Sequence, residues 1–224
     1  MKSSFTIPIA IILGGLVVAG AVYFSLRPPS TSSGTGNPAL VRPVASNDHI
    51  LGNPAAPVVI VEYSDFDCTY CKGFDETLRQ IIANEGAGGE VAWVFREFPL
   101  SEIHPNAFSH ARAAECAAQV AGNDAFWKFT NALFMNQPAD PANYGTLAAS
   151  VGISSDAFAT CVASASLAID ARINADRQNA LAVGAQGTPY SLILVKGHAP
   201  VVMDGAYSYD AVKQLIDQAL ETVK

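Results

Sequence analysis

Hydrophobic residues follow two different periods between residues 58 and 95. Val58 to Tyr63 is an apolar run rich in β-branched residues, which is typical of a strand buried on both faces. An amphipathic helical period follows to about Ala83, and a second apolar run covers Val91 to Phe95. A strand, a helix and a strand in this order predict a βαβ unit whose two strands pair in parallel.

A long helical block separates this unit from the C-terminal part of the chain. From about residue 104 to 183 the pattern is almost continuously helical, with breaks at Gly, Pro, Asn and Ser. Apolar runs at 191–195 and 201–203 then predict two strands, and an amphipathic period over 210–222 predicts a last helix. We therefore expect an α/β fold with a helical insertion at about 104–183.

The first 48 residues have a different pattern. Phe5 to Leu26 contains no charged residue, and its 22 residues would span about 33 Å as a helix, against about 30 Å for the hydrocarbon core of a bilayer. We expect residues 1–27 to be an N-terminal transmembrane anchor; a removed signal peptide is the alternative, because Ala19-Gly20-Ala21 resembles a cleavage site. Residues 28–48 are expected to be a flexible linker, and residues 49–224 the folded domain.

Composition limits the classes of function. Hydrophobic residues make up 50% of the 224 residues, which is enough for a substantial core. The formal net charge of −7 and the lack of a basic stripe in the sequence argue against nucleic-acid binding. Four cysteines together with an apolar leader favour an oxidising compartment, the periplasm or cell surface, over a cytosolic reductase.

Cys68 and Cys71 carry the chemistry that the sequence indicates. They lie where the first predicted strand gives way to the helix, separated by two residues. Backbone N–H groups and the positive end of the helix dipole stabilise a thiolate at such a position. We predict that Cys68 is the partly exposed nucleophile and that Cys71, one turn later, is the buried thiol that exchanges a disulfide with it.

Metal binding is the alternative use of these cysteines. Zinc normally needs four ligands, but Cys116 and Cys161 are far apart in the sequence and have no close histidine. A c-type haem needs a histidine after the second cysteine, where this chain has Lys72. We therefore expect no metal and no other cofactor. The histidines are expected at a helix cap, on the surface and in a turn, in the order His104, His110 and His198.

Acidic residues surround the cysteine pair. Glu62 lies within the first apolar strand, where burial would raise its pKa and let it exchange a proton with Cys71. An edge position with the carboxylate in water is the alternative. Asp65 and Asp67 oppose a thiolate on Cys68, so the sequence leaves the reduction potential open.

Several motifs taken together resemble the DsbA-like thioredoxin-fold family, from near Gly52 to the C-terminus. The resemblance implies a thioredoxin fold with a helical insertion. The combination is specific, whereas a CxxC pair alone is not. The motifs are Ser64-Asp65-Phe66-Asp67-Cys68-Thr69-Tyr70-Cys71, Phe98-Pro99-Leu100, His104-Pro105, Ala113-Ala114-Glu115-Cys116-Ala117, Phe126-Trp127 and Gly187-Thr188-Pro189.

The resemblance also implies roles for individual residues. Thr188-Pro189 is expected to be a cis peptide bond beside the cysteines, with a backbone that binds the client chain; an ordinary trans turn is the alternative. Cys116 and Cys161 are expected to form a structural disulfide, with two free thiols as the alternative. In the family an acidic residue six positions before the first cysteine handles a proton, and Glu62 has that position here.

These features predict a membrane-anchored thiol:disulfide oxidoreductase that introduces disulfides into secreted proteins outside the cytoplasm. The implied partners are reduced or unfolded secreted proteins and a DsbB- or VKOR-like membrane reoxidant. An isomerase or reductase is the second hypothesis, because Tyr70 and Thr188 resemble the DsbC and DsbG type. Those proteins carry an N-terminal dimerisation domain where this chain has only the expected anchor and linker. A non-catalytic tethered binding module is the third hypothesis.

Overall fold

A computed structural model describes residues 36–164 and 166–223 of the chain. The predicted transmembrane anchor and the first part of the predicted linker lie outside these residues. Within them, none of the helices combines the length and the apolar character that a membrane crossing requires.

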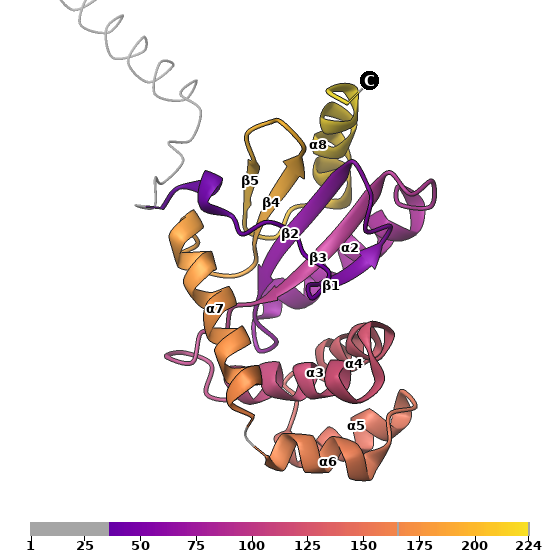
Figure 1. Cartoon of the computed structure of the whole chain (residues 1–224), viewed down its shortest axis with the longest axis vertical. Coiled ribbons are helices and arrows are strands. Elements are labelled where there is room, and N and C mark those ends of the chain that lie inside the picture. The colour runs from indigo at the N-terminus through magenta and orange to yellow at the C-terminus, as the bar shows by residue number, and fades with distance from the viewer. Residues whose placement is uncertain (1–35, 165, 224) are drawn as a thin grey trace, which may run out of the picture. The chain divides into compact units, whose positions relative to one another are not determined.

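A five-stranded sheet forms the centre of the domain, in the order β1-β3-β2-β4-β5 (Figure 1). Its strands are β1 (His49–Gly52), β2 (Val58–Ser64), β3 (Val91–Glu97), β4 (Tyr190–Val195) and β5 (Val201–Asp204). β2 and β3 pair in parallel and every other neighbouring pair is antiparallel. The central position of β2 explains its nearly unbroken apolar sequence, because both of its faces are covered.

Helices cover both faces of the sheet, each over its own apolar core. α2 (Thr69–Asn84) and α8 (Tyr209–Glu221) pack on the face that carries Val58 and Ile60, whereas α7 (Leu167–Val183) packs on the face that carries Val61 and Tyr63. The alternation of faces along a strand places Glu62 on the α2 side. The predicted α/β fold is confirmed.

The segment between β3 and β4 consists mainly of helices. α3 (Ala107–Ala121), α4 (Asn123–Met135), α5 (Tyr144–Ser150) and α6 (Ser155–Ala163) gather at one end of the sheet, and α7 returns the chain to it (Figure 1). Aromatic side chains join this block to β3, with Phe95 and Trp93 in contact with Phe126 and Trp127. The helices therefore share the core of the α2 face.

Residues 36–48 differ from the flexible linker predicted over 28–48, because they are packed on the domain. The Asn37 N–H donates to Ala182 O at 2.9 Å, and Arg42 pairs with Asp176 at 2.6 Å. Arg96 of β3 is fully buried and donates to both carboxylate oxygens of Asp48 at 3.1 Å. A buried guanidinium needs a carboxylate partner, and this segment supplies it.

Candidate active site

Cys68 lies at the N-cap of α2, at the end of the short turn that follows β2. The N–H groups of a first helical turn have no partner within the helix, and those of Tyr70 and Cys71 hydrogen-bond to the Cys68 sulfur. The thiol of Cys71 makes the largest contribution: its hydrogen bond and these N–H groups outweigh burial and lower the pKa of Cys68 from 9.0 to about 5. Cys68 is therefore a thiolate at neutral pH.

Cys71 has the opposite environment, three residues further along α2. It is fully buried, whereas Cys68 is 7% exposed, which is less than the sequence suggested for the nucleophile. Burial, the thiolate of Cys68 and the nearby Glu62 raise the pKa of Cys71 well above its ordinary value. The two sulfurs thus differ strongly in acidity although they are neighbours, and both are free thiols in the structure.

Glu62 lies in the middle of β2, fully buried beneath Cys71. Neither carboxylate oxygen has a hydrogen-bond partner among the described residues. Burial, helped by the charge of Asp75, raises the pKa of Glu62 from 4.5 to about 8, against the smaller effects of Ser64 and Trp93. A carboxyl group with such a pKa can both give and take a proton near neutral pH.

Asp75 is a site residue that the sequence analysis missed. It is buried on α2 and accepts two hydrogen bonds from Arg79, at 2.7 and 3.1 Å. Burial raises its pKa, although Arg79 opposes the shift. Asp75 follows Cys71 by four residues, so the helical period places both on one face of α2, toward Glu62. That spacing was the signal in the sequence.

Thr188 and Pro189 lie beside Cys68, although the two segments are about 120 residues apart. β4 pairs with β2, so the residues that precede β4 reach the end of β2 where the cysteine turn begins. The Thr188-Pro189 peptide bond is cis, and the Cys68 sulfur lies 3.3 Å from Thr188 O, to which its protonated form can donate. The structure thus brings together Cys68, Cys71, Glu62, Thr188 and Pro189, five residues singled out in the sequence.

A hollow of about 320 Å³ opens beside the Cys68 sulfur. Two exposed apolar side chains stand on its rim, Tyr70 and Ile103, at 73% and 69% exposure. Exposed large apolar groups around a reactive sulfur suit contact with an unfolded chain. The hollow is lined by Cys68, Thr69, Tyr70, Leu100, Ile103, His104, Gly187 and Thr188.

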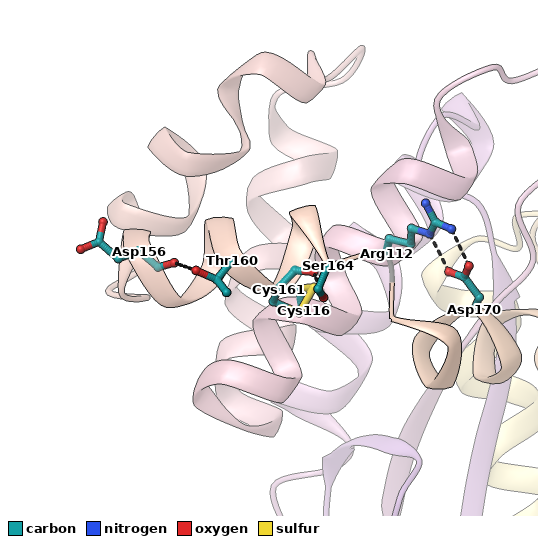
Figure 2. Close-up of a disulfide and its surroundings, with 7 residues drawn as sticks. All are labelled: Arg112, Cys116, Asp156, Thr160, Cys161, Ser164 and Asp170. Atoms are coloured by element: carbon teal, nitrogen blue, oxygen red, sulfur yellow. Dashed lines mark hydrogen bonds and ion pairs between the residues drawn. A yellow bond between two sulfur atoms is a disulfide. The ribbon is translucent and has the colours of Figure 1, made fainter.

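Cys116 of α3 and Cys161 of α6 form a disulfide within the helical block (Figure 2). The Ser164 hydroxyl donates to Cys161 O at 2.7 Å at the end of α6. One turn before Cys116 on α3, Arg112 pairs with Asp170 of α7. This disulfide ties α6 to α3 and is separate from the Cys68–Cys71 pair, which leaves that pair free for exchange.

Two histidines differ from their predicted surroundings. His110, expected on the surface, is fully buried in α3, and His104, expected at a helix cap, lies in the loop before α3 against Asp65. Across residues 36–164 and 166–223, no group of three or more His, Cys, Asp or Glu side chains is placed to hold a metal ion.

Part of the chain is similar to a segment of larger proteins that are named as Na(+)/H(+) antiporters. It is 34% identical over 164 residues to the Na(+)/H(+) antiporter NhaA 1 of Mycolicibacterium gilvum, which covers 71% of this chain and 25% of that protein. The chain is also 30% identical over 177 residues to the Na(+)/H(+) antiporter NhaA 1 of Salinispora arenicola, and the match covers 77% of this chain and 24% of that protein. The chain thus spans about a quarter of the length of these relatives.

Solved structures share the fold over most of the domain. Alpha-DsbA1 of Wolbachia pipientis has a TM-score of 0.69 at 23% identity, covering 84% of this chain and all (100%) of that one. Oxidised BdbD of Bacillus subtilis has a TM-score of 0.68 at 23% identity, covering 80% and 96%. The sequence model of the thioredoxin family matches residues 45–218. The chain therefore belongs to the thioredoxin family, with a fold of the DsbA-like type.

Proposed function

We propose that this chain is a thiol:disulfide oxidoreductase that introduces disulfides into reduced or unfolded proteins outside the cytoplasm. The observation that carries the proposal is the asymmetry of the cysteine pair. Cys68 is acidic and opens onto a hollow with an apolar rim, whereas Cys71 is buried and holds its proton. Such a pair accepts electrons from a client at one defined sulfur.

The reaction transfers one disulfide in two exchange steps. A client thiolate attacks the Cys68 sulfur of the oxidised pair; the Cys68–Cys71 bond breaks, and Cys71 leaves as a thiolate that takes up a proton. A second client thiolate then attacks the client sulfur of this mixed disulfide, and Cys68 leaves as a thiolate. The client loses two electrons and two thiol protons, and the cysteine pair gains both electrons.

Glu62 supplies the proton that Cys71 needs. An ionised Cys71 would be a buried, poorly solvated anion, because its pKa is well above the ordinary value. The carboxyl group of Glu62 lies close enough to Cys71 for its ionised form to raise the pKa of that thiol. With a pKa of about 8, Glu62 holds its proton at neutral pH and can give it to Cys71. Thr188 contributes its backbone, which lies against Cys68 where the client must bind.

The acidity of Cys68 favours the oxidase over the isomerase or reductase. A thiolate that is stable at neutral pH stabilises the reduced form of the pair, and the disulfide is then a stronger oxidant. About 30 mV in reduction potential corresponds to one pKa unit, so a pKa of about 5 in place of 9.0 is a large effect. The second candidate is separated from the first by measuring this potential against glutathione.

The proposal also covers where the domain works and which protein reoxidises it. An N-terminal anchor over residues 1–27 would hold the domain at the outer face of the membrane, near secreted clients. There a DsbB- or VKOR-like membrane protein would reoxidise the cysteine pair. The exposed side chains of Tyr70 and Ile103, at the rim of the hollow, would contact the client or the membrane reoxidant.

Two serine variants of the full chain test the assignment. Cys68→Ser should abolish oxidation of a reduced client, measured as the return of activity of reduced ribonuclease. Cys71→Ser, mixed with a client that already contains a disulfide, should instead accumulate a mixed disulfide between Cys68 and the client, visible on a non-reducing gel. The Cys68 thiolate attacks the client disulfide, one client thiol leaves, and no Cys71 thiol is present to break the new bond. Full client oxidation by the Cys68→Ser variant would disprove the assignment, and so would equal trapping by both variants.

A further inference from the structure

Two aspartates precede Cys68, and each is paired with a histidine from the helical block or its leading loop. Asp65 is fully buried; its Oδ1 accepts the Asp67 N–H at 2.8 Å, and its Oδ2 accepts the Leu100 N–H at 2.7 Å. The same Oδ2 lies 2.9 Å from Nδ1 of His104. Asp65 thus fixes the loop after β3 against the cysteine turn, and it holds His104 in place.

In the second pair, Asp67 with His110, the histidine is neutral. Nε2 of His110 lies 3.1 Å from Asp67, and its Nδ1 lies 2.6 Å from the Tyr144 hydroxyl. His110 is fully buried, and burial lowers its pKa although Asp67 acts in the opposite direction. This imidazole is therefore neutral at physiological pH and adds no positive charge beside Cys68.

His104 is the histidine that can carry a charge next to the reactive sulfur. Its side chain is 23% exposed and, together with Cys68, lines the hollow of about 320 Å³. Burial opposes its charge, but the hydrogen bond and charge of Asp65 and the negative charges of Cys68 and Asp67 outweigh burial and raise the pKa of His104.

The other charged neighbours of His104 come from its own loop and from α7. Glu102, two residues before it, pairs with Arg177 of α7 at 3.0 Å, so these two charges largely offset each other. The segment on the far side of the hollow, Gly187 and Thr188, brings no titratable side chain. The charges that face His104 are therefore Asp65, Asp67 and the Cys68 sulfur.

We propose that His104 is a positioning residue for disulfide exchange, whose imidazolium, fixed by Asp65, stabilises negative charge on the Cys68 sulfur across the shared hollow. The charge interaction between His104 and Cys68 does not depend on the proposed function. Only its consequence does, because a stabilised thiolate lets Cys68 leave the mixed disulfide with the client faster. The CxxC segment itself has no basic side chain between its cysteines, because the two residues there are Thr69 and Tyr70. The positive charge comes instead from a different part of the chain.

The two charges coexist over a defined range of pH. Cys68 is a thiolate above about pH 5, and His104 stays protonated up to a pKa raised above 6.5. Between these limits the thiolate and the imidazolium stabilise each other. The coupling is reciprocal: loss of the imidazolium must weaken the thiolate by the same factor by which loss of the thiolate weakens the imidazolium.

The first experiment titrates the Cys68 thiolate of the reduced full chain by its absorbance at 240 nm. His104→Gln should move the midpoint upward by about 0.5 to 1 pH unit, since a partly solvated opposite charge acts less strongly than a buried one. His104→Lys should restore the midpoint, because it restores the positive charge. His198→Gln, in an exposed turn, is the matched control and should leave it unchanged.

The second experiment needs no substitution and therefore does not depend on how a variant folds. The His104 ring is titrated by NMR in the reduced and in the oxidised wild-type chain. Its midpoint should fall by about 0.5 to 1 pH unit on oxidation, because the Cys68–Cys71 disulfide carries no negative charge. The size of this change should match the change in the thiolate midpoint of His104→Gln.

Three results would overturn the inference: an unchanged thiolate midpoint in His104→Gln, an upward shift in His104→Lys as large as in His104→Gln, or the same His104 midpoint in both redox states. The second of these would indicate a purely structural role. None of the measurements uses a client protein. A wild-type chain that shows the coupling but oxidises no client would therefore disprove the proposed function and leave the role of His104 standing.

Discussion

The buried carboxyl group of Glu62 gives a quantitative prediction about stability. Its pKa is 4.5 in an ordinary environment and about 8 in the folded chain, and the side chain is fully buried. A carboxyl group with a raised pKa holds its proton in the folded state after the unfolded chain has lost it. The contribution to stability is therefore fully present below pH 4.5, falls as the pH rises, and is lost above about pH 8.

The magnitude follows from the same two values. At about 1.4 kcal/mol for each pH unit, the interval from 4.5 to about 8 corresponds to roughly 5 kcal/mol. Glu62→Gln removes the titration and keeps the size of the side chain. Other buried acids, such as Glu97, titrate in both proteins and cancel in the comparison. The difference in unfolding free energy, variant minus wild type, should thus rise by about 3 to 5 kcal/mol between pH 4 and pH 9.

Urea unfolding of the oxidised chain at several pH values measures this difference, because the disulfide prevents the cysteines from titrating. Glu76→Gln, an exposed carboxylate on α2, is the matched control and should give a curve parallel to that of the wild type. The absolute stability of Glu62→Gln at one pH is not decisive, since a buried amide has its own cost. Parallel curves for Glu62→Gln and wild type would refute the assignment of a buried, proton-holding carboxyl group.

Further outcomes follow from the cysteines and from the buried ion pair. Alkylation of Cys68 by iodoacetamide in the reduced chain should be half-maximal near pH 5; a midpoint near 9 would contradict the thiolate. Replacing both Cys116 and Cys161 by alanine should cost about 4 kcal/mol of stability in denaturant, as expected for a cross-link of residues 45 apart, and leave the reduction potential unchanged. Arg96→Met should cost about 3 to 5 kcal/mol in the same assay. A loss below about 1 kcal/mol, as expected for Arg177→Met at a partly exposed ion pair, would contradict the role of Arg96.

The sequence predicts the central βαβ unit because the hydrophobic periods of its elements and the spacing of the cysteines indicate the same strand-to-helix junction. The apolar run of β2, the helical period of α2 and the apolar run of β3 each carry their own signal, and the CxxC pair marks the junction between the first two. Glu62 stands out for the same reason, as a carboxylate inside an apolar strand. Features of this kind depend on neighbours in the sequence, which a single chain displays directly.

Contacts between distant segments were predicted only where the family resemblance implied them, as for Thr188-Pro189 beside Cys68 and for Cys116 with Cys161. The residues alone did not predict the others. Asp65 and His104 are 39 residues apart, and their pairing depends on the path of a loop that has no period of its own. His110 could have been placed, because it follows Ala107 by three residues and precedes Ala114 by four, on the buried face of α3.

Residues 36–48 show why composition misled the prediction of a linker. Pro, Ser and Asn favour disorder when they have no partner, but a charged residue within an apolar strand requires one. Arg96 is such a residue in β3, and it is satisfied by Asp48 and by the backbone of Arg42 and Pro43. The signal for an ordered segment was thus located about fifty residues away from it.

In the proposed reaction, the opposite acidities of the two cysteines give Glu62 and His104 different tasks. Cys71 has a high pKa, which makes it a poor leaving group when a client attacks Cys68, and we propose that Glu62 delivers a proton as the bond breaks. Cys68 has a low pKa and leaves easily in the second step, and a positive charge on His104 favours that departure further. The acid beneath α2 therefore serves the first exchange and the imidazole in the hollow serves the second, which predicts that Glu62→Gln slows formation of the mixed disulfide whereas His104→Gln slows its resolution.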